Sequence, residues 1–207
     1  RAKARRLMNQ AGVAVQRPKR RGPVTTDSRH GYEVAPNLLA RQFDVARPDQ
    51  VWVGDISYVW TAEGWLYVST LLDLYSRKVV GWAMRSRIDT LLVEDTLRMA
   101  LGRRQPAAGL LHHSDRGSTY TCEDYQTYLA VQGILCSMSR RGDCYDNAVI
   151  ESFFATVKKE EGERFPSYSD AKMALFDYLE VFYNQQRRHS TLGQISPAAF
   201  ERQAAAR

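Results

Sequence analysis

The sequence predicts an α/β domain in which a mixed five-stranded sheet is flanked by helices. The first observation is a series of three segments between residues 51 and 84 that are rich in β-branched and aromatic residues and separated by short turns. The second is that two further short apolar segments alternate with helical patterns over residues 90–184. Hairpin strands pair antiparallel and strands joined through helices pair parallel, so we expect a mixed sheet.

The fifty residues before the first strand differ in composition from the rest. Residues 1–10 have the pattern of a helix end that stops near Gly12, and residues 13–50 have no sustained period, which is typical of an extended linker. Residues 1–50 carry 11 Lys/Arg and 4 Asp/Glu, a net charge of +7 that leaves −1 for the remainder. A basic arm at residues 1–49 favours a polyanionic partner. The alternative, a solvated linker that binds nothing, stays open.

Composition limits the remaining possibilities. At 207 residues and 44% hydrophobic, the chain is long enough to form one domain with a full core. Cys122, Cys136 and Cys144 include no Cys-x-x-Cys pair, which argues against a disulfide framework or a zinc cluster and indicates a reducing compartment. No apolar run reaches transmembrane length and no signal peptide is recognisable, so we expect a cytoplasmic protein. Because the sequence begins with Arg rather than Met, we expect it to be part of a longer chain.

The three strands of the first half are expected to form an antiparallel meander. Residues 51–60 are the first strand, residues 61–64 form a turn, residues 65–74 return as the second strand, and residues 78–84 form the third. Each connection is short enough for a hairpin. The first strand is expected to be central in the sheet.

The second half alternates helices and strands. The expected elements are a helix at 90–103, a strand at 109–113, a helix at 122–132, a strand at 134–137, a helix from Asp146 or Asn147 to about 160, and a long helix at 170–184. Asp and Asn are good N-cap residues, which is why the fifth element is expected to begin there. Three antiparallel strands followed by crossover units give the strand order of the ribonuclease H-like fold. The folded core is placed at residues 50–200, and residues 201–207 form a tail.

Three carboxylates occupy positions in this order from which they can converge. Asp115 follows a short strand and precedes a turn, at the carboxyl end where α/β proteins collect their ligands. Glu151 lies on a later helix, with 35 residues between it and Asp115. Asp55 lies within the first strand among apolar neighbours, where an unpaired carboxylate is costly. A shared divalent cation such as Mg²⁺ or Mn²⁺ would compensate all three. A hydrogen-bonded core aspartate remains the alternative for any one acid alone.

An ordered set of motifs contains these three acids. They are Trp52-x-x-Asp55-Ile56-Ser57-Tyr58; His113-Ser114-Asp115-Arg116-Gly117-Ser118-x-Tyr120; Ser139-Arg140-Arg141-Gly142 leading to Asp146-Asn147-Ala148-x-x-Glu151-Ser152-Phe153-Phe154; and Tyr183-Asn184-x-x-Arg187-x-His189-Ser190-x-Leu192-Gly193 with Ser196-Pro197. Together they resemble the catalytic core of bacterial insertion-sequence transposases, of the group made by frameshifting between two reading frames. That group is related to retroviral integrases, and the resemblance covers the chain from about residue 1 to residue 200. Thr119, where Gln is common, and Gly54, where a more polar residue is common, depart from the pattern without touching the chemistry.

The resemblance implies an enzyme. Asp55, Asp115 and Glu151 would be the Asp-Asp-Glu triad, holding two Mg²⁺ or Mn²⁺ ions for in-line phosphoryl transfer, first cleaving DNA at the ends of a mobile element and then joining it to a target. Asp55 would bridge the two ions. The implied partners are the element ends and target DNA, with a homo-oligomer assembled on that DNA. A ribonuclease H-like nuclease that only hydrolyses, and a non-catalytic DNA-binding regulator, are the two alternatives.

Several basic residues are candidate DNA contacts. The family has a Lys or Arg seven residues after the glutamate, and Lys158 stands there, nearly two helical turns from Glu151 and on the same face. An ordinary charged helix end is the alternative for Lys158 and its neighbour Lys159. The other candidates are Arg140 and Arg141 in the loop before the helix, Arg187 and His189 after the last helix, and Arg17, Lys19, Arg20 and Arg21 in the arm. For Arg187 and His189, DNA contact and a polar lock on the core are equally open.

Two other features receive structural interpretations. Adjacent His112 and His113 on a strand point to opposite faces and have no third partner at ligand spacing, so packing or hydrogen bonding is favoured over metal binding. Asp73 on the second strand is expected to be a structural acid that pairs with Arg77.

Overall fold

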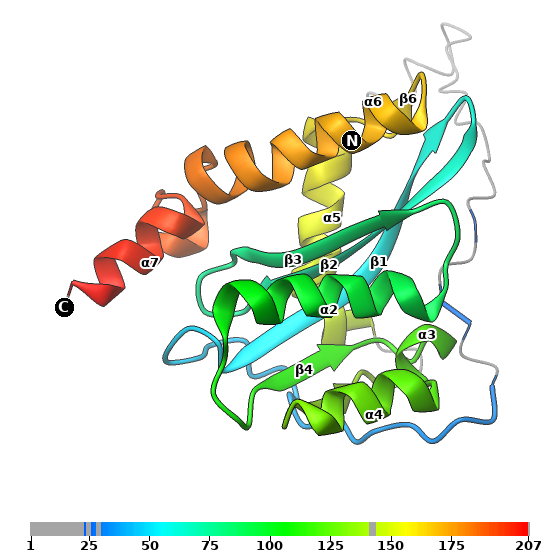
Figure 1. Cartoon of the computed structure of the whole chain (residues 1–207). Helices are drawn as coiled ribbons and strands as arrows, with labels where there is room; N and C mark the ends of the chain where they lie inside the picture. Colours follow the sequence, from blue (N-terminus) through cyan, green and yellow to red (C-terminus); the bar gives the residue numbers. More distant parts are fainter. Residues whose placement is uncertain (1–22, 24–25, 28–29, 141–143, 207) are drawn as a thin grey trace, which may run out of the picture.

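The computed structural model describes residues 23, 26–27, 30–140 and 144–206 (Figure 1). The expected helix end at residues 1–10, the arm residues Arg17, Lys19, Arg20 and Arg21, and Arg141 lie outside these ranges. Between residues 30 and 50 the chain forms turns and extended segments without a helix or strand.

The sheet has the expected mixed topology. Its strands are β1 (Val51–Thr61), β2 (Gly64–Asp73), β3 (Val79–Arg85), β4 (Leu111–Ser114) and β5 (Leu135–Met138), in the order β3-β2-β1-β4-β5. The first three strands pair antiparallel, and β4 is parallel to both β1 and β5. This confirms the meander and the central position of β1. A sixth strand, β6 (Arg164–Phe165), pairs with the end of β1. It was not expected, because two residues are too few to show a period.

Helices cover both faces of the sheet (Figure 1). On one face lie α2 (Thr90–Arg104), α3 (Ser118–Thr121) and α4 (Glu123–Val131), and on the other lie α5 (Ala148–Glu160) and α6 (Tyr168–Phe176). Helix α2 packs closely on β3 at Gly81. A Cβ added there would lie 2.3 Å from the carbonyl oxygen of Thr96. Only glycine allows this approach.

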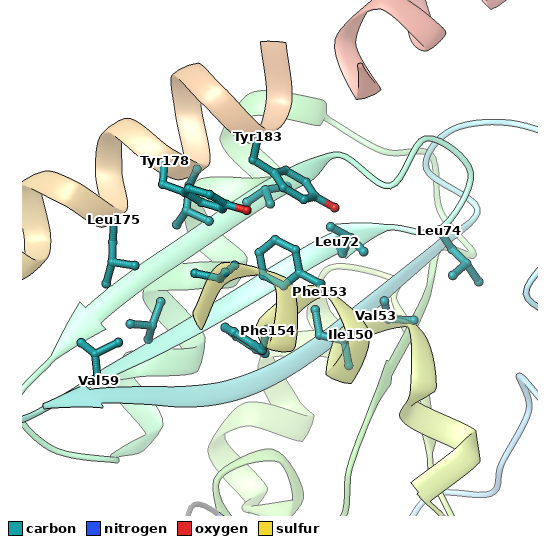
Figure 2. Packing of buried hydrophobic residues seen from close by; sticks show 14 of the residues in the cluster. Val53, Val59, Leu72, Leu74, Ile150, Phe153, Phe154, Leu175, Tyr178 and Tyr183 are labelled. Atoms are coloured by element: carbon teal, nitrogen blue, oxygen red, sulfur yellow. The ribbon is translucent and has the colours of Figure 1, made fainter. Parts of the chain in front are cut away.

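Alternation along β1 determines which side chains face α5. Val53 and Val59 belong to the core on the α5 side, whereas Trp52 and Ile56 belong to the core on the α2 side. Since successive residues of a strand point to opposite faces, Asp55 shares the α5 side with Val53. Figure 2 shows this core, in which Phe153 and Phe154 of α5 lie between the sheet and the helix that carries Tyr183.

The long helix expected at residues 170–184 consists of two parts. Helix α6 begins earlier, with the Ser167 side chain accepting from the Asp170 amide, and residues Asp177–Gln186 continue it as the π-helix η2. The buried residues of η2 recur five positions apart, Tyr178 with Tyr183 and Leu179 with Asn184, which fits the i to i+5 bonding of a π-helix. Both Asn184 amide atoms hydrogen-bond the backbone of Val79, so η2 is fixed to the start of β3.

The C-terminal region contains further structure. The 3₁₀ turn η3 (Ser190–Leu192) leads to α7 (Pro197–Ala205), whose N-terminus is capped by Ser196 and begins with a proline. Such a helix start is favourable because the missing proline N–H would be unpaired in any case. Helix α7 was not expected, and the boundary placed at residue 200 falls inside it.

Candidate functional site

Asp55 lies at the middle of β1, opposite Thr70 of β2. Its Oδ1 accepts a hydrogen bond from the Ile56 amide at 2.7 Å. Burial, together with the nearby charges of Asp115 and Glu151, raises the pKa of Asp55 to about 8 against the opposing effects of that amide and Lys158. The three acids are therefore near enough to interact electrostatically, and without a cation the site favours a protonated Asp55.

The residue before Asp55 is a glycine in a tightly packed position. A Cβ at Gly54 would lie 2.9 Å from Cδ2 of Leu71 and 3.4 Å from Nε2 of His112. Gly54 faces the α2 side, where these two side chains fill the space. The departure from the family pattern at Gly54 is thus a packing feature on the side away from Asp55.

Asp115 stands directly after β4, as expected for a strand-end carboxylate. Its two oxygens are both engaged: Oδ2 accepts from the Thr26 hydroxyl and Oδ1 accepts from the Gly117 amide at 2.8 Å. Burial raises the pKa of Asp115, and the two hydrogen bonds oppose that rise. Thr26 was not among the candidate residues, because a contact between residues 26 and 115 leaves no local pattern in the sequence.

Glu151 lies in the first turn of α5 and is exposed. The helix begins after Asn147, whose side chain makes no capping hydrogen bond, and the 3₁₀ turn η1 (Cys144–Asn147) precedes it. Asp146 is not the N-cap that its residue type suggested. Its buried carboxylate binds the guanidinium groups of Arg41 and Arg140, which lower the pKa of Asp146 well below its usual range.

Asp55 and Glu151 line one pocket of about 560 Å³ between β1 and α5. Lys158 and Lys159 line the same pocket, and the Lys158 Nζ lies 4.3 Å from the ring centroid of Tyr58. The prediction that Lys158 shares a face with Glu151 is confirmed by this common pocket. Tyr58 belongs to the motif around Asp55, and its contact with Lys158 was not predicted from the sequence.

The carboxylates at this site have the chemistry to bind a divalent cation, although their present arrangement does not form a complete metal site. Within the described part of the chain, no three His, Cys, Asp or Glu side chains form a ready metal-binding group. Asp115 is not in the pocket lining, and its oxygens are held by Thr26 and Gly117. Yet carboxylate oxygens are hard ligands, and a cation bound here would oppose the burial and the neighbouring acids that raise the pKa of Asp55.

The two histidines before Asp115 are structural. The His112 ring bonds the Tyr125 hydroxyl at 3.0 Å, and the His113 ring bonds the Ser137 hydroxyl at 2.8 Å. Burial lowers the pKa of each to about 4, so both are neutral at pH 7. The expectation of hydrogen bonding rather than metal binding is confirmed, and these bonds fix β4 between α4 and β5.

Asp73 is also structural, although its partners differ from the expected one. Its carboxylate accepts from the backbone amides of Asp49 and Ser76 and from the Ser76 hydroxyl. Arg77 contributes its backbone amide to the Asp73 carbonyl oxygen rather than a side-chain ion pair. The acid therefore stabilises the turn between β2 and β3.

The other candidate DNA contacts already have protein partners. Arg140 binds Asp146, and Arg187 binds both carboxylate oxygens of Glu160, with Nη2 to Oε1 at 2.8 Å. The His189 ring packs edge-on against Tyr183 at 4.9 Å between centroids. These contacts favour the polar lock for Arg187 and His189.

Comparison with known proteins gives consistent relatives. The pattern of the family described as "Integrase core domain" matches residues 45–144, and a second pattern of the same description matches residues 132–197. An uncharacterized 31 kDa protein of insertion element IS600 from Shigella sonnei is 49% identical over 184 residues, covering 88% of this chain and 68% of that protein. Transposase InsF for insertion sequence IS3A of Escherichia coli strain K12 is 42% identical over 196 residues, covering 94% and 68%.

Solved structures show the same fold at low identity. The HTLV-2 integrase catalytic core domain in complex with magnesium, in its trimeric form, has a TM-score of 0.57 at 12% identity and covers 76% of this chain and 99% of that chain. A chain of the simian T-cell lymphotropic virus intasome in complex with a PP2A regulatory subunit has a TM-score of 0.60 at 13% identity, covering 86% and 61%. The ribonuclease H-like prediction is therefore confirmed. In the described part of the chain, no helix is both long and apolar enough to cross a membrane.

Proposed function

The chain belongs to the IS3 family of insertion-sequence transposases, and on that premise we propose that Asp55, Asp115 and Glu151 are its catalytic carboxylates. Members of this family are DNA transposases with an integrase core, enzymes that transfer polynucleotide strands. The observation that carries the residue assignment is the electrostatic coupling of the three acids. Burial with two neighbouring acids raises the pKa of Asp55 to about 8, in a pocket it shares with Glu151.

The cofactor we propose is a pair of Mg²⁺ or Mn²⁺ ions held by the three carboxylates. When bound, such ions supply Lewis-acid stabilisation of the attacking and leaving oxygens in an in-line displacement. Asp55 occupies the rigid central strand and fixes the position of the site. Asp115 directly follows β4 and Glu151 lies in the first turn of α5, so in this proposal three separate elements supply the ligand set. No protein nucleophile is needed.

The lysines of the same pocket bind the substrate backbone in this proposal. Lys158 lies on the pocket wall near Asp55 and is held over the ring of Tyr58, which limits the positions of its ammonium group. A cation beside the carboxylates orients a DNA phosphate toward them. Lys159 lines the pocket as a second cation.

DNA is the proposed partner, in the form of element ends and target. Joining two ends to one target requires two active sites in one assembly, so we propose that the chain acts as a homo-oligomer on DNA. Light scattering with and without end DNA tests this proposal. A monomer that persists in active complexes contradicts it.

The catalytic proposal is tested by strand transfer with oligonucleotides that carry the ends of the source element. We expect Mn²⁺- or Mg²⁺-dependent cleavage and joining by the wild type, and a loss of both by several orders of magnitude in Glu151→Gln. DNA affinity in Ca²⁺ and the melting temperature should stay near the wild-type values, because Gln keeps the size and helix propensity of Glu.

Matched variants complete the test. Asp55→Asn and Asp115→Asn should separate binding from chemistry in the same way, whereas Glu161→Gln, at the C-cap of the same helix and outside the pocket, should retain activity. Joining at a comparable rate by Glu151→Gln would refute the triad. Cleavage without any joining by the wild type would favour the plain nuclease.

A further inference from the structure

A second pocket lies against a different side of α5. It has a volume of about 520 Å³ and is lined by Val149, Ser152 and Thr156 of the helix, whereas the acidic pocket is lined by Glu151 and Lys158. At 100° per residue, these two sets point in widely separated directions. Nothing in the proposed chemistry uses this second pocket.

The charges in the second pocket all have one sign. Three arginines line it, Arg77, Arg187 and Arg188, and no aspartate or glutamate does. Arg187 is already neutralised by Glu160. Arg188 is exposed at the pocket rim. The pocket is therefore suited to an anion.

Arg77 supplies the most specific observation. Its Nη1 is buried and has no hydrogen-bond partner among the described residues, and its Nη2 makes one long bond of 3.5 Å to the Phe43 carbonyl oxygen. A buried guanidinium N–H without an acceptor is costly, and proteins rarely leave one unpaired. One or two oxygens of a bound oxyanion would satisfy its two N–H groups.

The remaining lining is partly aromatic. Phe43, Phe153 and Tyr183 contribute to the pocket beside hydroxyl groups such as that of Thr191. A pocket of this size matches a group larger than a free inorganic ion. A ligand with an oxyanion and an attached flat or apolar group would match both the arginines and the aromatic residues of the lining.

We propose that this pocket binds one nucleotide through its phosphate, with Arg77 and Arg188 as the anion-binding side chains and the aromatic floor against the sugar or base. The inference rests on the proposed function in taking a DNA strand as one source of the nucleotide; a free mononucleotide has the same chemistry. A helix with its side chains is about 10–12 Å wide, so a strand whose reacting phosphate lies beside Glu151 reaches the second pocket within a few nucleotides.

The test compares DNA binding by the full 207-residue chain with that of two variants. Arg188→Gln removes the exposed cation, and Arg77→Gln/Arg188→Gln removes both. The matched control is Arg98→Gln, which removes an exposed charge from α2 on the opposite face of the sheet. The probe is a fluorescent 25-base-pair duplex in Ca²⁺, titrated at several salt concentrations, with 2′-deoxyadenosine 5′-monophosphate as a second probe followed by saturation-transfer NMR.

We expect the double variant to bind DNA about tenfold more weakly and the slope of log K against log salt to fall by about one, as for one lost phosphate contact. Arg188→Gln should show a smaller loss in the same direction and Arg98→Gln none. Saturable mononucleotide binding that is lost in the double variant identifies the nucleotide itself as the ligand. Absence of mononucleotide binding, with the DNA effect present, identifies the strand as its source.

Two results separate this inference from the proposed function. If both pocket variants bind both probes like the wild type while strand transfer by the wild type proceeds, the inference is wrong and the catalytic assignment stands. If the wild type joins no DNA but its DNA or mononucleotide affinity still depends on Arg188, the pocket stands and the proposed function fails. Since Arg188 is exposed, its variant keeps the test valid even where Arg77→Gln unfolds.

Discussion

The ammonium group of Lys158 lies over the ring of Tyr58, 4.3 Å from its centroid, at the edge of the pocket that contains Asp55 and Glu151. A strand residue thereby fixes the free end of a helical side chain that is seven positions beyond Glu151. Such a contact contributes about 0.5–1 kcal/mol where it is exposed. The main effect of the contact is to restrict the position of the Lys158 ammonium group, because an unrestrained lysine samples many rotamers.

The first prediction concerns this pair. Tyr58→Phe keeps the ring and should leave strand transfer within about twofold of the wild type, whereas Tyr58→Leu should lower it several-fold through a weaker hold on Lys158. Lys158→Ala should lower it further, and Lys158→Ala combined with Tyr58→Leu should add little to Lys158→Ala alone. A double-mutant cycle on the rate of single-turnover strand transfer measures the coupling. Additive losses would show that Tyr58 acts independently of Lys158.

The second prediction follows from the raised pKa of Asp55. The folded-state pKa is about 8 against an ordinary 3.8, so between these values the folded protein binds the extra proton. The contribution of Asp55 to the free energy of unfolding of the metal-free protein should therefore decrease as the pH rises from about 4 to 8, opposite in sign to the contribution of the buried His112 and His113 between about pH 4 and 6.5. Asp55→Asn should remove this decrease and raise the melting temperature at pH 8 by a few degrees.

Melting in EDTA at pH 6 and pH 8 measures the effect, and Glu33→Gln, at an exposed acid in the segment before β1, is the control for removal of an acid. Mg²⁺ should raise the wild-type melting temperature more at pH 8 than at pH 6 and should raise that of Asp55→Asn less. A wild type that is more stable at pH 8 than at pH 6 in EDTA, with Asp55→Asn unchanged, contradicts the assignment of this titration to Asp55.

Part of this site is predictable from local periodicity and part is not. Strand alternation and a seven-residue helical spacing place Asp55, Glu151 and Lys158 correctly, because each rule depends only on the backbone geometry of one element. The contact of Thr26 with Asp115 joins residues 89 positions apart and has no such rule. Asp146 has the residue type of a helix cap but binds two arginines instead, since a tertiary ion pair is stronger than a local capping preference.

The same limit applies to the fold. Hydrophobic alternation predicts β1 to within one residue, whereas β6 is too short to carry a pattern. The π-helix η2 was expected as ordinary helix, although buried residues five positions apart, such as Tyr178 and Tyr183, were a readable signal. A spacing of five is uncommon enough that the 3.6-residue period is the default interpretation.

The third prediction tests the lock at the end of η2. Glu160 accepts hydrogen bonds from Nε and Nη2 of Arg187 and one from the Tyr178 hydroxyl, which joins the end of α5 to η2. Arg187→Ala and Glu160→Gln should each lower the melting temperature at pH 7 by a few degrees, a small effect because the pair is partly exposed and screened. Arg187 lowers the pKa of Glu160 below 4.5, so the stabilisation is present above that pH and is lost as the pH falls through the lowered value.

DNA affinity separates the lock from a direct contact. If Arg187 only stabilises the fold, both variants should bind DNA like the wild type at a temperature well below melting. If Arg187→Ala alone weakens DNA binding and reduces its salt dependence, Arg187 contacts phosphate. Equal melting temperatures for the wild type and both variants would contradict the lock.

The last prediction concerns Thr26. The Thr26 hydroxyl donates to Asp115 Oδ2, and we expect this bond to break when that oxygen turns toward a cation shared with Asp55. The bond therefore competes with metal binding by about 1 kcal/mol, the net value of a typical hydrogen bond, which corresponds to about a fivefold change in affinity. Thr26→Val keeps the shape and removes the donor, so it should lower the Mg²⁺ concentration for half-maximal activity about fivefold, whereas Thr26→Ser should behave like the wild type. Isothermal titration calorimetry measures Mg²⁺ affinity independently of catalysis. The effect of Thr26→Val is measured both in the wild type and in the Glu151→Gln background. If Thr26→Val instead requires more Mg²⁺, the hydroxyl orients Asp115 for the metal rather than withholding it.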